Sequence, residues 1–379
     1  MSNPLPHFSA YPLEDFRRSE TEILAATAAV MQGGHYILGT EVARFEEEFA
    51  TFCGASYALG VANGTDAIEL LLLGLDLGPG DAVAVPSHTA VASISAIRRT
   101  GADPVFVDID PDSFTMAPSS LEAAIAGPAG HRIKAVLAVH LYGHPADLPA
   151  LAAVCTAHGL ALLEDCAQAH GATIGGRPVG SLARGGAFSF YPTKNLGGIG
   201  DGGAITTNDG TLMERMREIR QYGWRERYIS AREGVNSRLD ELQAAILRVK
   251  LPLLATNNQR RRELAAHYRA ALAGNPHLTL PAIRSGCGHV FHLHVIRTPH
   301  RDELMAHLLS LGFPVALHYP AAVHQQPAYA SFAKHSPPLP QTERTIREIL
   351  TLPLHSSLSE DAVEAMSAAI NRWEPRPSG

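Results

Sequence analysis

Cysteine, basic charge and long apolar runs are all scarce in this sequence of 379 residues. Its four cysteines are scattered and form no Cys-x-x-Cys pair, which favours reduced thiols in a cytoplasmic protein. A net charge of −6 offers no electrostatic footprint for nucleic acid. No apolar run is long enough to span a bilayer, and the polar, proline-broken residues 1–11 lack the apolar core of a signal peptide. We therefore expect a cytoplasmic protein that binds neither nucleic acid nor a membrane.

Apolar residues, by contrast, make up 46% of the chain, which is enough for a large core. From residue 81 onward, strand-like runs alternate with helical patterns, and this predicts a mainly parallel sheet with helices on both faces. Pro252 separates two predicted helices, so we place a large domain at residues 1–252 and a small α+β domain at 253–379. The elements expected in the small domain are strands at 289–296 and 314–318 and helices at 301–311, 343–349 and 360–371.

Polar segments follow most of the predicted strands of the large domain. In open parallel sheets, ligands bind outside the carboxyl ends of the strands. The segments at these ends are 63–66, 87–89, 140–144, 165–170 and 189–194. Their convergence predicts one site at a single edge of the sheet.

A lysine stands at a break in the chain that is rich in glycine. The strand-like residues 187–191 end at Pro192, Lys194 follows, and a glycine cluster continues to Gly203. Glycines allow the backbone to approach a ligand closely. A lysine desolvated there can lose its proton and form a Schiff base with a carbonyl compound or with pyridoxal phosphate. The simpler alternative for Lys194 is a solvated surface charge.

Two further features fit such a cofactor. The run from Val61 to Asp66 predicts a strand, a glycine turn and the start of a helix, an arrangement that binds anions, although a plain helix cap is the alternative. Asp165 ends a buried strand, where a carboxylate is costly without a partner. A protonated pyridine nitrogen would be such a partner, whereas the alternative is a cap for a helix that starts at Ala167.

Histidines gather near the predicted strand of the small domain. His289, His292 and His294 have i, i+3, i+5 spacing, and His300 follows. A metal-dependent enzyme that uses them is one alternative function. We predict no bound metal.

Taken together, six motifs in order make the chain recognisable over nearly its whole length. They are residues 61–67 (VANGTDA), 86–89 (PSHT), 139–143 (VHLYG), 164–171 (EDCAQAHG), 188–195 (FSFYPTKN) and 234–240 (GVNSRLD). The chain resembles the DegT/DnrJ/StrS family of pyridoxal-phosphate sugar aminotransferases. This resemblance implies the α/β fold type I of pyridoxal-phosphate transferases, in which a large domain with a mainly parallel seven-stranded sheet flanked by helices carries a smaller C-terminal α+β domain.

The resemblance also implies a role for individual residues. Lys194 would hold the cofactor and later carry a proton, and Asp165 would keep the pyridine nitrogen protonated so that the ring acts as an electron sink. The other cofactor-binding residues implied are Gly64, Thr65 and Ser189 at the phosphate, Gln168 near the ring and its 3-oxygen, and Asn236 at the phosphate of the neighbouring subunit. Asn236 thereby implies a homodimer with shared active sites.

One position departs from the family pattern. The family usually places an aromatic residue on the pyridine ring after Pro-Ser-x-Thr, but here Thr89 is followed by Ala90, which cannot stack. We hypothesise that His88 covers that face of the ring instead.

Retention of Lys194 favours transamination over the dehydration carried out by relatives that have histidine there. By analogy, glutamate would donate the amino group and a keto-deoxysugar on a nucleoside diphosphate would accept it, most closely a dTDP-3-keto-6-deoxyhexose. The substrate contacts expected are Tyr191, His318 and Tyr319, with Arg225 and Arg238 for a carboxylate or diphosphate. The alternatives are a 4-keto sugar nucleotide, a keto-cyclitol, or a non-catalytic regulator on the same fold.

Overall fold

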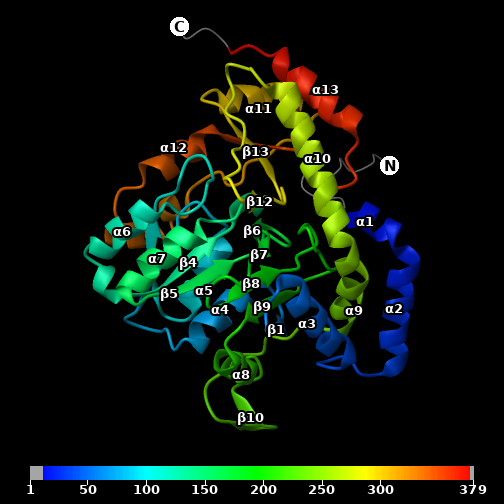
Figure 1. Ribbon diagram of the computed structural model, residues 1–379, viewed down its shortest axis with the longest axis vertical. Coiled ribbons are helices and arrows are strands. Elements are labelled where there is room, and N and C mark those ends of the chain that lie inside the picture. Colours follow the sequence, from blue (N-terminus) through cyan, green and yellow to red (C-terminus); the bar gives the residue numbers. More distant parts are fainter. Residues whose placement is uncertain (1–11, 376–379) are drawn as a thin grey trace.

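The computed structural model describes residues 12–375. Its centre is a seven-stranded sheet with the order β1-β9-β8-β5-β4-β2-β3 (Figure 1). Strand β9 runs antiparallel to both of its neighbours, and the other adjacent pairs are parallel. The strands are β1 (Tyr57–Val61), β2 (Ala82–Pro86), β3 (Asp103–Val107), β4 (Ile133–Val139), β5 (Ala161–Asp165), β8 (Gly186–Ser189) and β9 (Gly203–Thr207). The predicted sheet is thus confirmed.

The strands are buried on both faces because their side chains alternate between two helical layers. In β2, Val83 and Val85 pack with α4, α5 and α8, whereas Ala82 and Ala84 pack with α6 and α7. Near β1 and β8 the second layer consists of α3 and α9. The helices are α3 (Thr40–Cys53), α4 (Gly64–Gly74), α5 (Val91–Arg99), α6 (Pro118–Ala126), α7 (Leu148–His158), α8 (Gly210–Ile219) and α9 (Glu241–Lys250).

The C-terminal part has its own apolar cluster above the sheet in Figure 1. It is built from α10 (Leu254–Leu272), α11 (Arg301–Ser310), α13 (Glu360–Asn371) and the antiparallel pair β13 (His294–Arg297) and β14 (Ile349–Leu352). Pro252 lies in a 3-10 turn between α9 and α10. Val323 and Leu339 come after the predicted boundary but pack into the core of the large sheet, so the two parts share apolar contacts. The division between residues 252 and 253 therefore stays a prediction.

Two strand predictions in this part are wrong. The strand expected at 289–296 begins only at His294, because Phe291 has a φ of +44° and breaks the extended backbone. The segment 314–318 makes one isolated bridge, at Ala316, to Thr351. The pairing strand is β14 instead, which starts where helix α12 (Pro340–Glu348) ends.

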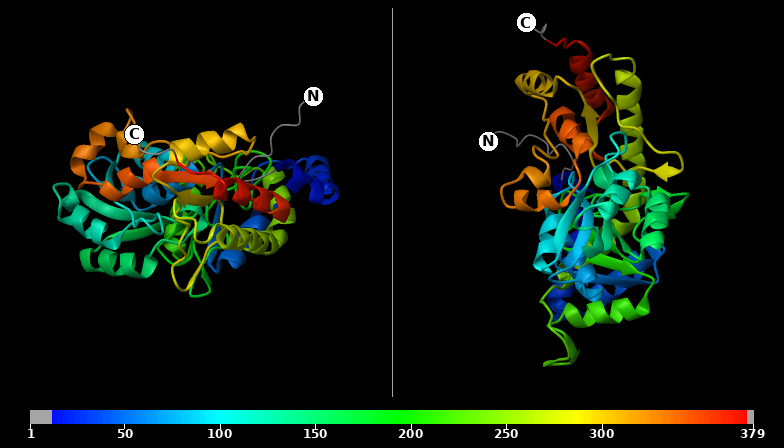
Figure 2. Two further views of the ribbon diagram at one scale, coloured as in Figure 1. Left: turned by 90° about the horizontal axis from the view of Figure 1, so that it is seen from above. Right: turned by 90° about the vertical axis from the view of Figure 1, so that its left-hand side faces the viewer.

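Two peripheral elements extend from the body. Helix α2 (Glu20–Gly33) runs beside α9 and carries the short helix α1 (Pro12–Arg18) at one end, and a two-stranded arm of β10 (Trp224–Glu226) and β11 (Ile229–Ser230) projects at the opposite end from α13 (Figures 1 and 2). A small sheet of β6 (Thr173–Ile174), β7 (Arg177–Pro178) and β12 (Cys287–Gly288) joins residues far apart in the sequence. None of the helices within residues 12–375 has the length and apolar character needed to cross a membrane.

Candidate active site

The predicted strand-end site exists as a cavity of about 240 Å³. The loops after β1, β2, β4, β5 and β8 all contribute to its wall, as expected for the carboxyl edge of a parallel sheet. Its polar lining residues are Asn63, Thr65, Thr89, Asp165, Gln168, Ser189, Tyr191, Lys194 and Asp201. Seven of the predicted residues, namely Gly64, Thr65, Asp165, Gln168, Ser189, Tyr191 and Lys194, therefore line one space.

One end of the cavity is built to hold an anion. Asn63 caps helix α4, and its side chain accepts the N–H of Asp66 at 2.8 Å. The amide groups of Gly64 and Thr65 lie in the first turn and so have no partner within the helix. A Cβ at position 64 would lie 2.7 Å from the Ser189 Cβ, so only glycine lets α4 meet the end of β8 this closely. This end suits a phosphate group.

Lys194 enters the cavity from the turn after β8. Burial lowers the pKa of its amine from the ordinary value to about 8, and the Asp165 carboxylate offsets part of that shift. The turn is anchored by Asn195, whose Nδ2 donates to Asn258 Oδ1 at 2.8 Å and whose Oδ1 accepts from His292 at 3.1 Å. Lys194 is therefore a half-buried side chain with a lowered pKa, held by its turn, and not a solvated surface charge.

Asp165 ends β5 and is 5% exposed. One carboxylate oxygen accepts the hydroxyl of Ser93 at 2.8 Å, and the other accepts the N–H of Ala167 at 3.1 Å. The cap suggested from the sequence is therefore present as a single turn contact. Each oxygen keeps a lone pair that a protonated ring nitrogen can use.

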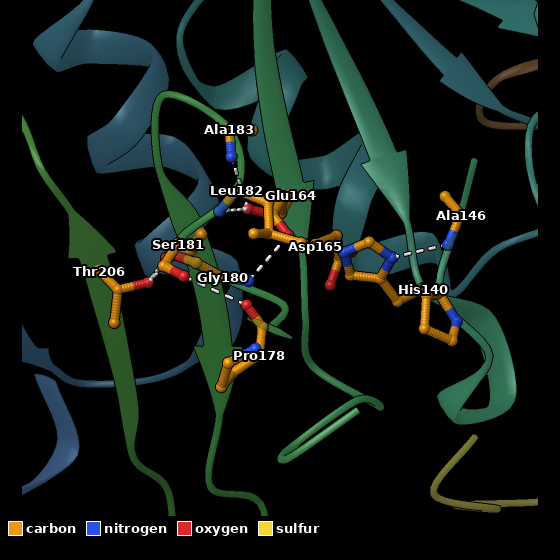
Figure 3. Close-up of polar contacts among 12 residues, drawn as sticks. His140, Ala146, Glu164, Asp165, Pro178, Gly180, Ser181, Leu182, Ala183 and Thr206 are labelled. Carbon is orange, nitrogen blue, oxygen red and sulfur yellow. Dashed lines mark hydrogen bonds and ion pairs between the residues drawn. The ribbon is translucent and has the colours of Figure 1, made fainter. Parts of the chain in front are cut away.

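Glu164, one residue earlier, points to the opposite face of β5 and serves the fold (Figure 3). Its two oxygens accept the N–H groups of Gly180, Leu182 and Ala183 at 2.7–2.9 Å, together with the ring of His140 at 3.0 Å. The other nitrogen of His140 accepts the N–H of Ala146, so the proton lies on Nε2. These hydrogen bonds attach the loop 178–183 to the end of β5.

Tyr142 does not line the cavity but holds Gln168, which does, and we call this side of the cavity the far wall. Its N–H donates to Gln168 Oε1 at 2.7 Å, which leaves Gln168 Nε2 to donate to the Tyr319 hydroxyl at 3.1 Å. The Tyr142 hydroxyl donates to the carbonyl of His318 and so accepts from His88 Nε2 at 2.7 Å. Sequence reasoning gave Tyr142 no role of its own, although it lies in the segment 140–144 that follows β4.

His88 lies differently from its hypothesised place on the ring. It is 1% exposed and turned toward Tyr142, while Thr89 and Ala90 face the cavity. Burial lowers the pKa of His88 to about 3, so the ring is neutral. The hydrogen bond to Tyr142 explains the orientation, and nothing in the geometry supports stacking by His88.

The predicted substrate residues fall into two groups. His318 and Tyr319 stand beside the cavity: burial is the main cause that lowers the pKa of His318 to about 4 and raises the pKa of Tyr319 to about 12. Arg225 and Arg238 instead line a separate, open cavity under the arm, and Arg225 pairs with Glu218 at 2.9 Å.

Asn236 and Tyr191 are both exposed, but they differ in their position relative to the cavity. Asn236 is exposed, forms a β-bridge with Gln221 and does not line the cavity of its own chain. Tyr191 is 52% exposed at the cavity mouth.

The histidine cluster does not assemble into a metal site. His289 accepts the N–H of Phe291, His292 bonds Asn195, and His294 stacks on Tyr268 at 4.8 Å. Within the described part of the chain, only His140, Glu164 and Cys166 bring three ligand atoms within 4.8 Å of one another. Both ring nitrogens of His140 and both oxygens of Glu164 are already hydrogen-bonded there. The metal-dependent alternative therefore gains no support.

Three residues of the site were not predicted from the sequence. Ser93 and Asn195 hold Asp165 and the lysine turn, and Asp201 lines the cavity. Asn195 and Asp201 stood within the glycine-rich stretch and could have been found there. Ser93 carried no signal, because a serine in the first turn of a helix is common.

Comparisons with known proteins agree with this geometry. Residues 17–371 match the DegT/DnrJ/EryC1/StrS aminotransferase family. A Streptomyces venezuelae protein named dTDP-3-amino-3,4,6-trideoxy-alpha-D-glucose transaminase is 46% identical over 359 residues, which cover 95% of this chain and 93% of that protein. The dTDP-3-amino-3,6-dideoxy-alpha-D-galactopyranose transaminase of Aneurinibacillus thermoaerophilus is 44% identical and covers 94% of this chain and 96% of its own.

A solved structure is equally close. The crystal structure of S. venezuelae DesV in complex with a ketimine intermediate has a TM-score of 0.93 and 44% identity, and the match covers 99% of this chain and 100% of that one. The chain therefore belongs to the DegT/DnrJ/EryC1/StrS aminotransferase family, and it is a pyridoxal-phosphate-dependent transaminase of fold type I.

Proposed function

We propose that this transaminase moves an amino group from glutamate to a keto-deoxysugar carried on a nucleoside diphosphate, specifically a dTDP-3-keto-6-deoxyhexose. The observation that carries the proposal is the placement of Lys194 and Asp165 in one cavity whose other end suits a phosphate. The names of the relatives given above support the dTDP-linked sugar, since both are transaminases of dTDP-3-amino sugars.

The residues present fit pyridoxal phosphate. Gly64, Thr65 and Ser189 would hold its phosphate, Asp165 its ring nitrogen, and Lys194 would carry it covalently. The second hydrogen of Gln168 Nε2 remains for the 3-oxygen, because the first goes to Tyr319. When bound, the cofactor supplies an electron sink for the carbon next to the reacting nitrogen.

The chain itself moves the proton. Because burial keeps the pKa of Lys194 near 8, its Nζ can accept a proton from the donor carbon and return it near neutral pH. Tyr319 stays protonated at that pH, so its hydroxyl can donate to an acceptor sugar. His318 stays neutral beside it.

We extend the proposal to a homodimer with shared sites. Asn236 is exposed rather than turned to its own cavity, and the β10–β11 arm carries the exposed side chains of Tyr228 and Ile229. A second copy that covers this arm would bring Asn236 and the open cavity of Arg225 and Arg238 toward the partner's site. Light scattering on the purified protein tests the dimer. We place the protein in the cytoplasm because its four cysteines are free thiols.

The experiment combines the glutamate half-reaction with the complete reverse reaction, both on the purified holoenzyme. Glutamate should move the visible band of the bound cofactor into the near-ultraviolet. A dTDP-3-amino-6-deoxyhexose with 2-oxoglutarate should then turn over in the reverse direction. A panel of UDP-linked 3-amino sugars, dTDP-4-amino sugars and aminocyclitols supplies the comparison. Faster turnover of any of these would overturn the acceptor assignment, and a colourless protein that ignores pyridoxal phosphate would overturn the cofactor.

A further inference from the structure

The carboxylate that faces the cavity has a buried hydroxyl behind it. Ser93 is 0% exposed, lies in the first turn of α5, and donates to Asp165 at 2.8 Å. Thr89, 3% exposed, lies 3.0 Å from the Ser93 oxygen. Since the only hydroxyl hydrogen of Ser93 goes to Asp165, Ser93 must accept from Thr89. The hydrogen bonds therefore run in one direction, from Thr89 to Ser93 to Asp165.

This chain of hydroxyls fixes the plane of the carboxylate. Without Ser93, Asp165 would keep only the N–H of Ala167, and a carboxylate held at one oxygen can rotate. Hydrogen bonds in a buried chain also polarise one another, which strengthens the last bond, the one to the charged group. The orientation of Asp165 toward the cavity thus depends on a helix that follows a different strand, β2.

We propose that Ser93 is a positioning residue for the cofactor ring, which it aligns through Asp165 with Thr89 as its own support. The proposal rests on the proposed role of Asp165 as partner of the ring nitrogen. Ser93 itself lies behind the cavity wall and does not line it.

The test measures cofactor binding rather than turnover. Full-length Ser93→Ala, depleted of cofactor, is titrated with pyridoxal phosphate, and the pH midpoint of its visible band is recorded. We expect the half-saturating concentration to rise about tenfold, the scale of a hydrogen bond to a charged group. We also expect the pH midpoint of the band to move up. A protonated ring nitrogen disfavours a second positive charge at the Lys194 nitrogen, and in Ser93→Ala the ring nitrogen would be protonated less often.

Matched variants separate this role from a structural one. Ser93→Thr keeps the hydroxyl and should restore both readouts, and Ser95→Ala removes a serine from the same helix and should match the parent. If Ser93→Ala does not fold, Thr89→Val against Thr89→Ser tests the hydroxyl that donates to Ser93, with a change in half-saturating concentration of about two- to threefold expected. Thr89 also lines the cavity, so an upward move of the pH midpoint in Thr89→Val is required as well.

Asp165→Asn distinguishes the two levels of the proposal. Weaker binding in Asp165→Asn with unchanged binding in Ser93→Ala, or in Thr89→Val where that variant is used, would overturn the inference and leave the role of Asp165 intact. Unchanged binding in Asp165→Asn would overturn both.

Discussion

Glu164 and Asp165 are neighbours on one strand, yet their carboxylates differ in how many hydrogen bonds the protein supplies to them. Both are buried carboxylates at the end of β5, and the period of two in a strand sends them to opposite faces. Glu164 accepts from four donors supplied by the protein, whereas Asp165 accepts from two. A buried carboxylate that is saturated by its own chain holds the fold together, and one with acceptor capacity left toward a cavity is available to a ligand.

The largest effect on activity should come from Lys194, which lies in the same cavity as Asp165. Lys194→Ala is expected to lower transaminase activity at least about 10³-fold, because the group that carries the proton is lost. The melting temperature should change little, and Lys134→Ala, an exposed lysine on β4, is the control. Activity within tenfold of the parent would show that another group moves the proton.

Substitution of Glu164 should instead lower the free energy of unfolding. Glu164→Ala leaves three N–H groups and the neutral ring of His140 without an acceptor, which should cost about 3–5 kcal/mol in the free energy of unfolding because each unsatisfied buried donor costs about 1–3 kcal/mol. Asp165→Asn should cost about 1 kcal/mol. Urea denaturation of both variants measures this difference, and equal losses would remove the distinction between the two carboxylates.

The two carboxylates should also differ in their effect on pH dependence. Incorporation of pyridoxal phosphate into cofactor-free protein needs a deprotonated Lys194, so its rate should rise with pH with a midpoint near 8. Asp165 raises the pKa of Lys194, so Asp165→Asn should move the midpoint down. Glu164→Gln should leave it in place. A midpoint near the ordinary value for lysine would contradict the burial that the structure shows.

The smallest effect is expected at the far wall. Tyr142→Phe removes two neutral hydrogen bonds, the one to the carbonyl of His318 and the one from His88. Loss of the first, worth about 1 kcal/mol, should raise the KM for the nucleotide sugar about fivefold. Cofactor binding should stay within about twofold, because the contact from the Tyr142 N–H to Gln168 remains. A loss of cofactor in His88→Asn, with cofactor retained in Tyr142→Phe, would restore a role for His88 at the ring.

Particular elements show why some predictions succeeded. The alternation of strands and helices predicted the sheet, since two-sided burial leaves continuous apolar runs that are readable without contacts. Lys194, Thr65 and Ser189 were predicted to meet because the carboxyl ends of parallel strands share one edge. In the C-terminal part, the helices expected at 301–311, 343–349 and 360–371 are present as α11, α12 and α13. The strands there are short, and a single positive φ at Phe291 moves a boundary, so pattern alone misplaced them.

The sequence by itself determined the fold class, the place of the site and the residue types that carry the chemistry. Only the tertiary structure decided which of two adjacent carboxylates has capacity left, that His88 turns away to Tyr142, and that Ser93 stands behind Asp165. The physical reason is that hydrogen-bond saturation depends on donors brought together from distant strands and loops, and no local pattern records their number or direction.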